Sequence, residues 1–281
     1  MGSAIKKSCG LAYLDVRSNH SNAIIFIHGN SHSKMTFTHQ LSDERFSLFR
    51  TIAVDLSGHG DSDKLNEYSL TAMAKTLCDF IADLKLKNYI LVGHSLGGHV
   101  LTQALTQLTP RALVLYGTPP LKKPLSLEGF LPNPKTAPLN LDHSTQNELE
   151  ILAAEFGYQN SDKEIFIHDY LKTDPTFRTT LLPSVVQGHY QDETALLEKF
   201  EGKTLGIVLN RDFIVNNDYI RREYSNLSID IVEVDSAHCP HVEVAQSFNS
   251  IISRFAQDVF SFKDEKMAQT LSKDEAVIIN E

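Results

Sequence analysis

A short glycine-rich turn between an apolar run and a helical pattern constrains this chain more than any other feature. The run Tyr89–Val92 is apolar, as expected for a strand buried on both sides. It leads directly into Gly93-His94-Ser95-Leu96-Gly97-Gly98, after which apolar residues recur at helical spacing. Glycines on either side of a serine permit a tight, strained turn that raises the hydroxyl above the sheet. The pattern therefore predicts that Ser95 is a nucleophile at the end of a strand.

The rest of the chain alternates short β-branched runs with helical stretches. This alternation predicts the α/β class, with a mostly parallel sheet covered by helices on both faces. The expected strands are Ala23–Ile27, Thr51–Val54, Tyr89–Val92, Ala112–Tyr116, Leu205–Leu209 and Ile229–Val234. The expected helices that pack on this sheet are Ser69–Leu86, with Ser69 as its N-cap, Leu96–Leu108 and His241–Phe260.

A proline-rich segment separates the two halves of the predicted sheet. Six prolines lie between residues 119 and 138, and each interrupts regular structure. Helical patterns follow over Thr145–Phe156, Ser161–Leu171 and Ser184–Phe200. We therefore predict that residues 119–200 form a helical cap inserted in a core made of residues 1–118 and 201–281. The charged stretch 261–281 is expected to be a surface appendage.

Charge and composition limit the possible partners. Lys and Arg number 26 against 35 Asp and Glu, so the net charge is −9 and a nucleic-acid partner has little electrostatic support. No secretory pattern and no run of about 18 apolar residues occurs, which predicts a cytoplasmic protein that does not bind membranes. The three cysteines lie far apart without a C-x-x-C pair, so neither a disulfide framework nor a zinc site is expected. We expect a monomer or homodimer with no metal and no cofactor.

A serine nucleophile needs a general base, and the base needs a carboxylate that holds its tautomer. The best base is His238, in a loop after the predicted strand Ile229–Val234, because loops at the carboxyl ends of parallel strands converge on one edge of the sheet. The best carboxylate is Asp212, in the loop after Leu205–Leu209. The chain order Ser95, Asp212, His238 is the order found when an α/β-hydrolase sheet carries such a triad.

Other histidines and carboxylates compete for these roles. His241 lies close to His238 in the sequence, and we expect it at the surface or in contact with the cap. His28 follows a strand, and we expect it to brace a loop by hydrogen bonds. Asp218 and Asp235 are the rival carboxylates, each of which could equally be solvated.

The mechanism also requires two backbone donors for the oxyanion of a tetrahedral intermediate. One donor should be the amide of Leu96, at the start of the helix after Ser95. The second should be the amide of Asn30 in the loop His28-Gly29-Asn30-Ser31, where Gly29 lets the backbone approach closely.

Together these residues resemble the α/β-hydrolase superfamily, and the resemblance covers almost the whole chain. It includes the turn Asp55-Leu56-Ser57-Gly58-His59-Gly60-Asp61-Ser62 and the run His238-Cys239-Pro240-His241. Ala237 stands where that family commonly has glycine, which affects only the expected shape of the loop. A serine at position 95 argues against haloalkane dehalogenases and epoxide hydrolases, whose nucleophile there is aspartate.

Three further motifs are similar to the metal-independent N-acyl-homoserine lactone lactonases of this superfamily. They are His28-Gly29-Asn30-Ser31, Leu96-Gly97-Gly98-His99 and Gly117-Thr118-Pro119-Pro120. In that family the triad acid can sit one position further on, where this chain has Phe213, so Asp212 remains the expected carboxylate. The resemblance implies hydrolysis of a small acylated lactone, with the cap closing over the acyl chain.

The expected activity is cleavage of a carboxylic ester or lactone through an acyl-enzyme on Ser95. Two alternatives remain open: a hydrolase-like ligand receptor with slow or no turnover, and a carbon–carbon bond hydrolase or cofactor-free oxygenase on the same scaffold. Substrate choice should depend on the cap, whose large apolar residues could line a cavity or form the cap's own core. These residues are Phe130, Leu131, Phe156, Tyr158, Phe166, Tyr170, Phe177 and Tyr190.

Overall fold

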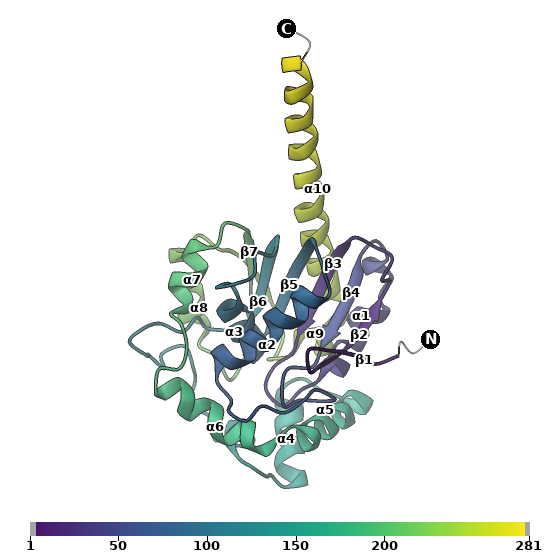
Figure 1. The fold of residues 1–281 in the computed structure, drawn as a ribbon. Coiled ribbons are helices and arrows are strands. Elements are labelled where there is room, and N and C mark those ends of the chain that lie inside the picture. The colour runs from purple at the N-terminus through teal and green to yellow at the C-terminus, as the bar shows by residue number, and fades with distance from the viewer. Residues whose placement is uncertain (1–3, 279–281) are drawn as a thin grey trace.

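A mixed sheet of eight strands runs through the part of the chain described by the computed structural model, residues 4–278, with side chains described to residue 261. The strand order is β1-β2-β4-β3-β5-β6-β7-β8, and helices cover both faces (Figure 1). Strands β1 and β2 are antiparallel to their neighbours, and the other pairs are parallel. The strands are β1 (Lys6–Ser8), β2 (Leu11–Val16), β3 (Asn22–Ile27), β4 (Arg50–Val54), β5 (Asn88–His94), β6 (Ala112–Tyr116), β7 (Lys203–Leu209) and β8 (Asp230–Val234).

The structure confirms the predicted α/β class and all six predicted strands. The prediction missed β1 and β2, which form the antiparallel edge of the sheet. The buried carboxylate of Asp15 on β2 pairs with Arg50 of β4 and with Lys6 of β1, so this edge depends on ion pairs between distant residues. Local sequence patterns do not reveal these ion pairs, and the two strands were therefore not predicted.

Helices on the two faces of the sheet bury alternate residues of the same strands. Ile25 and Phe26 of β3, for example, belong to opposite apolar layers, as the two-residue period of a strand requires. On one face lie α2 (Leu70–Asp83), α3 (Leu96–Ala104) and α8 (Asn217–Asn226). The other face is covered by α1 (Thr38–Ser42) and α10 (Ala245–Ile278), together with the short helices η1 (Lys34–Phe37), η2 (Glu44–Phe46) and α9 (Pro240–Glu243).

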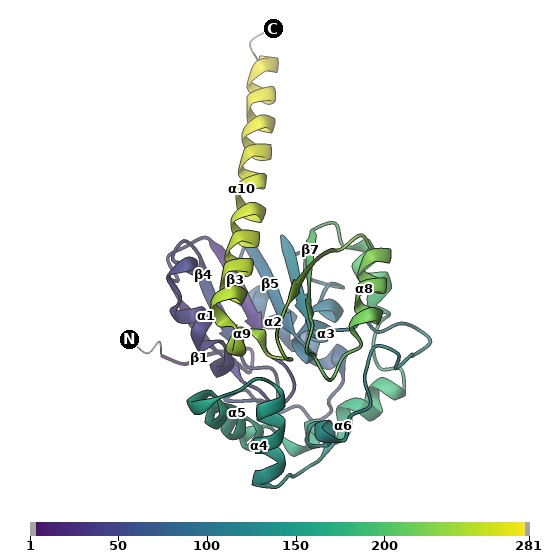
Figure 2. The same cartoon turned by 180° about the vertical axis from the view of Figure 1, so that it is seen from behind.

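Several helix boundaries differ from the predicted ones. The side chain of Ser69 accepts a hydrogen bond from the Ala72 amide, as predicted, but α3 ends at Ala104 rather than Leu108. The pattern predicted over Ser184–Phe200 is divided between two helices, because Gly188 takes a left-handed conformation between them. Helix α10 continues to Ile278 and extends beyond the body of the molecule (Figures 1 and 2), so residues 261–278 of the expected appendage are part of that helix. Residues 279–281 of that stretch lie outside the described residues.

The segment between β6 and β7 places most of its helices at the carboxyl ends of the strands (Figure 2). Its contacts with the loops after β3 and β4 include hydrogen bonds from Asn30 to the Leu139 carbonyl and from the Asp174 amide to the Gly58 carbonyl. Its last helix packs instead against α3. The division into a core and an inserted cap stays a prediction. The helices are η3 (Pro134–Asn140), α4 (Gln146–Glu155), α5 (Asn160–Lys172), α6 (Pro175–Val186) and α7 (Glu193–Lys199).

No helix in the described residues is both long enough and apolar enough to cross a membrane.

Candidate active site

Ser95 occupies a strained turn between β5 and α3. Its backbone has φ 50° and ψ −118°, a conformation that costs free energy for any residue other than glycine. The turn is held because the Ser95 amide donates to the Tyr116 carbonyl over 2.9 Å and the Ser95 carbonyl accepts from Gly98 and Thr118. In the described part of the chain the Ser95 hydroxyl makes no hydrogen bond. The predicted elbow therefore exists and presents a free hydroxyl.

Two glycines make this turn possible. A Cβ atom at Gly97 would contact the carbonyl oxygens of Ile27 and His28, because the first turn of α3 lies directly against the end of β3. A Cβ atom at Gly93 would overlap the side chain of Leu101 and lie 2.7 Å from the Cα atom of Gly98. Any larger residue at either position would push α3 away from the sheet.

Asp212 and His238 form a buried pair at the carboxyl ends of β7 and β8. The Nδ1 atom of His238 donates to Oδ2 of Asp212 over 2.6 Å, and both side chains are at most 2% exposed. The other carboxylate oxygen accepts from the amides of Ile214 (2.8 Å) and Val215 (3.3 Å), which fixes its orientation. Because Nδ1 carries the proton in this bond, Nε2 is left as the proton acceptor of the neutral ring.

The loop that carries His238 is tied to the turn that carries Ser95. The Nε2 atom of His94 donates to the His238 carbonyl over 2.9 Å, and the His238 ring lies against Gly117, at the end of the strand next to β5. No hydrogen bond joins Ser95 Oγ to His238 Nε2 in the described residues. In proteins without bound substrate such bonds are often long or poorly aligned. The three predicted residues thus lie at one edge of the sheet, and the hydrogen bond between Ser95 and His238 is not formed.

The rival residues lie elsewhere. Asp218 pairs with Arg221 and Asp235 with Arg211, and both carboxylates are exposed to solvent. The surface position expected for His241 is wrong, because its ring is fully buried beside the end of β6, where its nitrogens lie 2.9 Å from Thr36 Oγ1 and 3.3 Å from the Tyr116 hydroxyl. The short helix α9, which begins at Pro240, turns this residue into the protein.

The two predicted oxyanion donors are both available. Within the described residues neither the Asn30 amide nor the Leu96 amide donates to another protein group, and both residues line a cavity that Ser95 also lines. The side-chain amide of Asn30 donates to the Leu139 carbonyl over 3.0 Å, and its backbone carbonyl accepts from His32 over 2.7 Å. The loop after β3 is therefore held in place while its amide stays free.

Buried neutral histidines surround this loop. Nε2 of His28 accepts from the Leu56 amide and Nδ1 donates to the Gly29 carbonyl, which supports the predicted bracing role. Burial lowers the pKa values of His28, His32 and His59 to about 3. These rings therefore remain uncharged at neutral pH.

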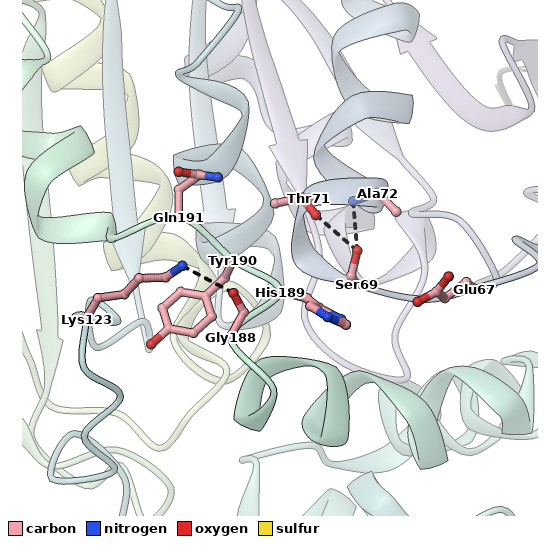
Figure 3. A pocket seen from close by; sticks show the side chains of 9 residues that line it. All are labelled: Glu67, Ser69, Thr71, Ala72, Lys123, Gly188, His189, Tyr190 and Gln191. Carbon is pink, nitrogen blue, oxygen red and sulfur yellow. Dashed lines mark hydrogen bonds between the residues drawn. The ribbon is translucent and has the colours of Figure 1, made fainter.

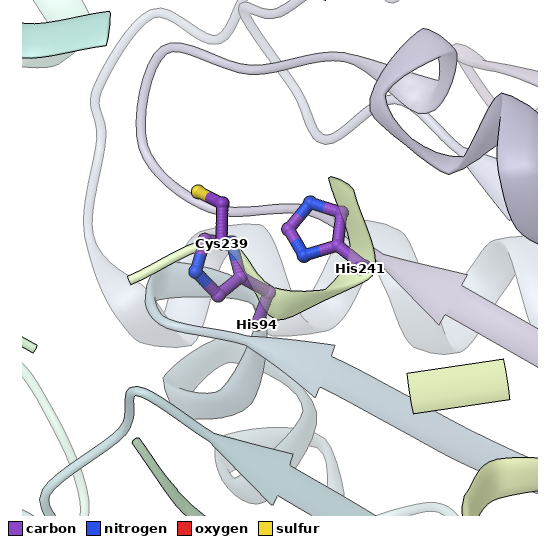
Figure 4. A group of neighbouring side chains, drawn as sticks. All are labelled: His94, Cys239 and His241. Carbon is purple, nitrogen blue, oxygen red and sulfur yellow. The ribbon is translucent and has the colours of Figure 1, made fainter. Parts of the chain in front are cut away.

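A further group of buried side chains has the composition of a metal site. His94, Cys239 and His241 each place a potential ligand atom within 4.8 Å of the others (Figure 4). Both nitrogens of His241 already have hydrogen-bond partners, and burial raises the pKa of the Cys239 thiol well above its usual value. A metal bound by His241 would have to displace one of these hydrogen bonds and would also require deprotonation of the thiol, so the donor set fits a metal poorly.

The cavity at Ser95 has a volume of about 310 Å³ and mostly apolar walls. Ser95 is the only one of the three predicted catalytic residues in its lining. Among the large cap residues only Phe130 and Leu131 face it, and the others named above are buried in the packing of the protein. The lining comprises Asn30, Leu70, Ser95, Leu96, His99, Leu121, Leu127, Phe130, Leu131, Thr136, Leu139, Asn140, Arg178, Leu181, Leu182, Val185 and Ile214.

Sequence reasoning assigned no role to His99, which lies four residues after Ser95 and lines the same cavity. Its Nδ1 atom donates to the buried carboxylate of Glu193 over 2.8 Å. The spacing of one helical turn was the available signal, because residues four apart share a helix face. The partner, 94 positions away, could not be read from the sequence.

Another hollow, of about 400 Å³, opens at the start of α2 (Figure 3). Its walls are mainly polar, and Lys123 on one side donates to the Gly188 carbonyl over 3.2 Å. Ser69 in its wall is already engaged as the helix cap. None of the predicted catalytic residues lines it.

Comparisons with known proteins agree with this geometry. The sequence profile of the family described as "Alpha/beta hydrolase family" matches residues 24–250. The chain is 23% identical over 262 residues to "Putative esterase/lipase 2" of Mycoplasma genitalium, covering 85% of this chain and 90% of that protein.

Two solved structures are similar in fold. One is N-acyl homoserine lactonase AidH complexed with N-butanoyl homoserine, with a TM-score of 0.80, 20% identity, and coverage of 92% of this chain and 97% of that one. The other is the esterase EaEST from Exiguobacterium antarcticum, with a TM-score of 0.72, 19% identity, and coverage of 92% and 100%. At this level of identity the likeness establishes the fold alone.

Proposed function

Because the chain belongs to the alpha/beta hydrolase family, we propose that it cleaves a carboxylic ester or lactone of a small acylated substrate through an acyl-enzyme on Ser95. The observation that carries the proposal is the strained Ser95 turn beside the buried Asp212–His238 pair. The similarity to an esterase/lipase over most of the chain supports the ester class, and the lactonase neighbour makes N-acyl homoserine lactones a candidate substrate.

In the proposed reaction the Ser95 hydroxyl attacks the carbonyl carbon and His238 Nε2 accepts its proton. Asp212 keeps the ring in the required tautomer and stabilises the imidazolium that forms. The free amides of Asn30 and Leu96 donate to the oxyanion, an interaction worth about 3 to 4 kcal/mol per donor in related sites. His238 then protonates the leaving alcohol, and a water molecule activated by the same ring releases the acid.

This scheme requires the serine hydroxyl and His238 Nε2 to come within hydrogen-bonding distance when substrate binds. The hydroxyl makes no competing hydrogen bond in the described chain, so no bond must be broken to reach the ring. The cavity is near the lower end of the volumes typical of small-molecule sites, and its apolar walls suit a short acyl group.

The test compares wild-type protein with Ser95→Ala and with Ser225→Ala, a serine exposed on α8. The substrates are p-nitrophenyl esters of increasing acyl length and a panel of N-acyl homoserine lactones. We expect Ser95→Ala to reduce kcat/KM at least about a thousandfold, since the serine is the attacking group, and Ser225→Ala to leave it unchanged.

Two other results would contradict ester hydrolysis. Saturable binding of these compounds without turnover would indicate a receptor. Cleavage of a β-diketone with no turnover of any ester would indicate a carbon–carbon bond hydrolase. Full ester turnover by Ser95→Ala would remove Ser95 as the nucleophile.

A further inference from the structure

The buried His99–Glu193 pair beside the cavity has no part in the reaction just described. His99 lies on α3 one turn beyond Ser95, about 6 Å along the helix axis. Its side chain is 10% exposed and lines the cavity. A polar side chain in a mostly apolar wall is the kind of group that gives a pocket its specificity.

Glu193 is held on every side and in turn holds the ring of His99. Its Oε2 atom accepts from His99 Nδ1 (2.8 Å) and from the Leu121 amide (2.9 Å), and its Oε1 atom accepts from Gln103 Nε2 (3.1 Å). The Glu193 amide also donates to the Leu121 carbonyl over 2.8 Å. These bonds fix the carboxylate, and the carboxylate fixes the orientation of the imidazole.

The remaining ring nitrogen, Nε2 of His99, has no hydrogen-bond partner in the described part of the chain, and the surrounding protein does not enclose this atom completely. It is therefore open to the cavity. Since Nδ1 must donate to the carboxylate, Nε2 of the neutral ring carries a lone pair and can only accept a hydrogen bond. The wall next to Ser95 thus presents an acceptor whose orientation is fixed by Glu193.

We propose that His99 is a positioning residue whose Nε2 atom accepts a hydrogen bond from the substrate, so that the preferred ester or lactone carries an N–H or O–H donor close to the reacting carbonyl. This inference rests on the proposed function and narrows its substrate class. Two kinds of substrate supply that donor: esters with an N-acylamino group beside the carbonyl, and esters of hydroxy acids.

The test uses pairs of phenyl esters that differ only in the donor. Phenyl N-acetylglycinate is compared with its N-methyl analogue, and phenyl glycolate with phenyl methoxyacetate. We expect wild-type kcat/KM to favour the donor in at least one pair by roughly three- to tenfold, the value of one neutral hydrogen bond. The pair that shows the preference identifies the source of the donor. No preference in either pair would overturn the proposal.

Three variants separate a direct contact from a structural role. His99→Asn keeps an N–H for Glu193 but has no atom at the position of Nε2, so the donor preference should fall to about one. His99→Gln can extend its amide oxygen into the cavity and should retain part of the preference. His189→Phe, at an exposed histidine outside this cavity, serves as the control and should keep the full preference. A wild-type preference in His99→Asn would overturn the proposal, and thermal unfolding checks that each variant is folded.

Failure of the proposed function is distinguishable from failure of this inference. If wild-type protein hydrolyses neither these esters nor phenyl butanoate, the esterase proposal is wrong. The binding of N-acetylglycinamide and of its N-methyl analogue, measured by calorimetry with wild-type and His99→Asn proteins, then tests His99 directly. Equal affinities of the two amides for wild-type protein would overturn the role of His99.

Discussion

Lowering the pH from 7 to 5 should weaken the fold by several kcal/mol, because the native protein keeps buried histidines uncharged. The pKa values of His28, His32 and His59 are lowered to about 3 by burial, against 6.5 for an exposed ring. For a group whose pKa is lower in the folded state, the unfolded chain binds the extra proton. The stability contribution is therefore present above pH 6.5 and is lost as the pH falls.

The magnitude follows from linkage. At pH 5 the unfolded rings are almost fully protonated and the native rings are not, which costs about 2 kcal/mol per histidine, or about 6 kcal/mol for the three. Asp169 acts in the opposite direction, because burial raises its native pKa to about 6. Because the folded state binds the extra proton at this carboxyl, Asp169 increases the unfolding free energy by about 1 kcal/mol between pH 7 and pH 5. The net loss of about 4 to 5 kcal/mol is comparable to the whole stability of a marginal domain.

The assay is urea unfolding followed by circular dichroism between pH 5 and 7.5 at constant ionic strength. His59→Asn keeps a donor for the Ser57 carbonyl and removes one titrating group, so it should reduce the slope of unfolding free energy against pH by about 1.4 kcal/mol per unit near pH 5. His143→Asn, at an exposed position, should keep the wild-type slope. A loss below about 1 kcal/mol between pH 7 and 5 would refute the reasoning, and so would an unchanged slope in His59→Asn.

Three further predictions follow from single contacts. Gly97→Ala should lower kcat/KM for p-nitrophenyl esters by about a hundredfold, because its methyl group would force the loop of Asn30 away from the Leu96 amide, and unchanged kinetics would contradict the assigned oxyanion donors. Asp212→Asn should reduce kcat by about 10⁴-fold with an unaltered circular dichroism spectrum, since an amide does not hold the required histidine tautomer, and a loss below about tenfold would exclude Asp212 as the partner. Asp169→Asn should raise the unfolding free energy at pH 7 by up to about 3 kcal/mol, because the raised native pKa of Asp169 destabilises the folded state when the carboxyl is ionised in the unfolded chain. Urea titrations should show that this gain disappears as the pH falls toward 4.

The parts of the fold that were predictable are those in which local pattern and burial agree. Strand β6 begins and ends where its apolar run does, because both faces of the strand are covered. The meeting of Ser95, Asp212 and His238 at one edge followed from the rule that the carboxyl ends of parallel strands converge. The superfamily predicted from these residues is confirmed by the family match over residues 24–250.

The parts that were not predictable depend on contacts between distant residues. Strand β2 is stabilised by an ion pair from Asp15 to Arg50, 35 positions away. His241 was expected at the surface or in contact with the cap, but the helical turn that begins at Pro240 directs its ring into the protein. The apolar spacing of residues 184–200 continues across the break at Gly188, so periodicity alone could not locate the end of α6. The orientation of the His99 ring depends on Glu193, which is 94 positions away in the sequence, so it could not be predicted.

The hydrogen bond from the Asn30 side chain to the Leu139 carbonyl links chemistry to access. Asn30 supplies a proposed oxyanion donor, and Leu139 belongs to η3, which forms part of the cavity wall. A molecule that displaces this wall on entering must either break the bond or pull the donor loop with it. Ligands that fit without moving η3 therefore leave the proposed oxyanion donor of Asn30 in place. Bulkier ligands would displace this amide, on which their own turnover would depend.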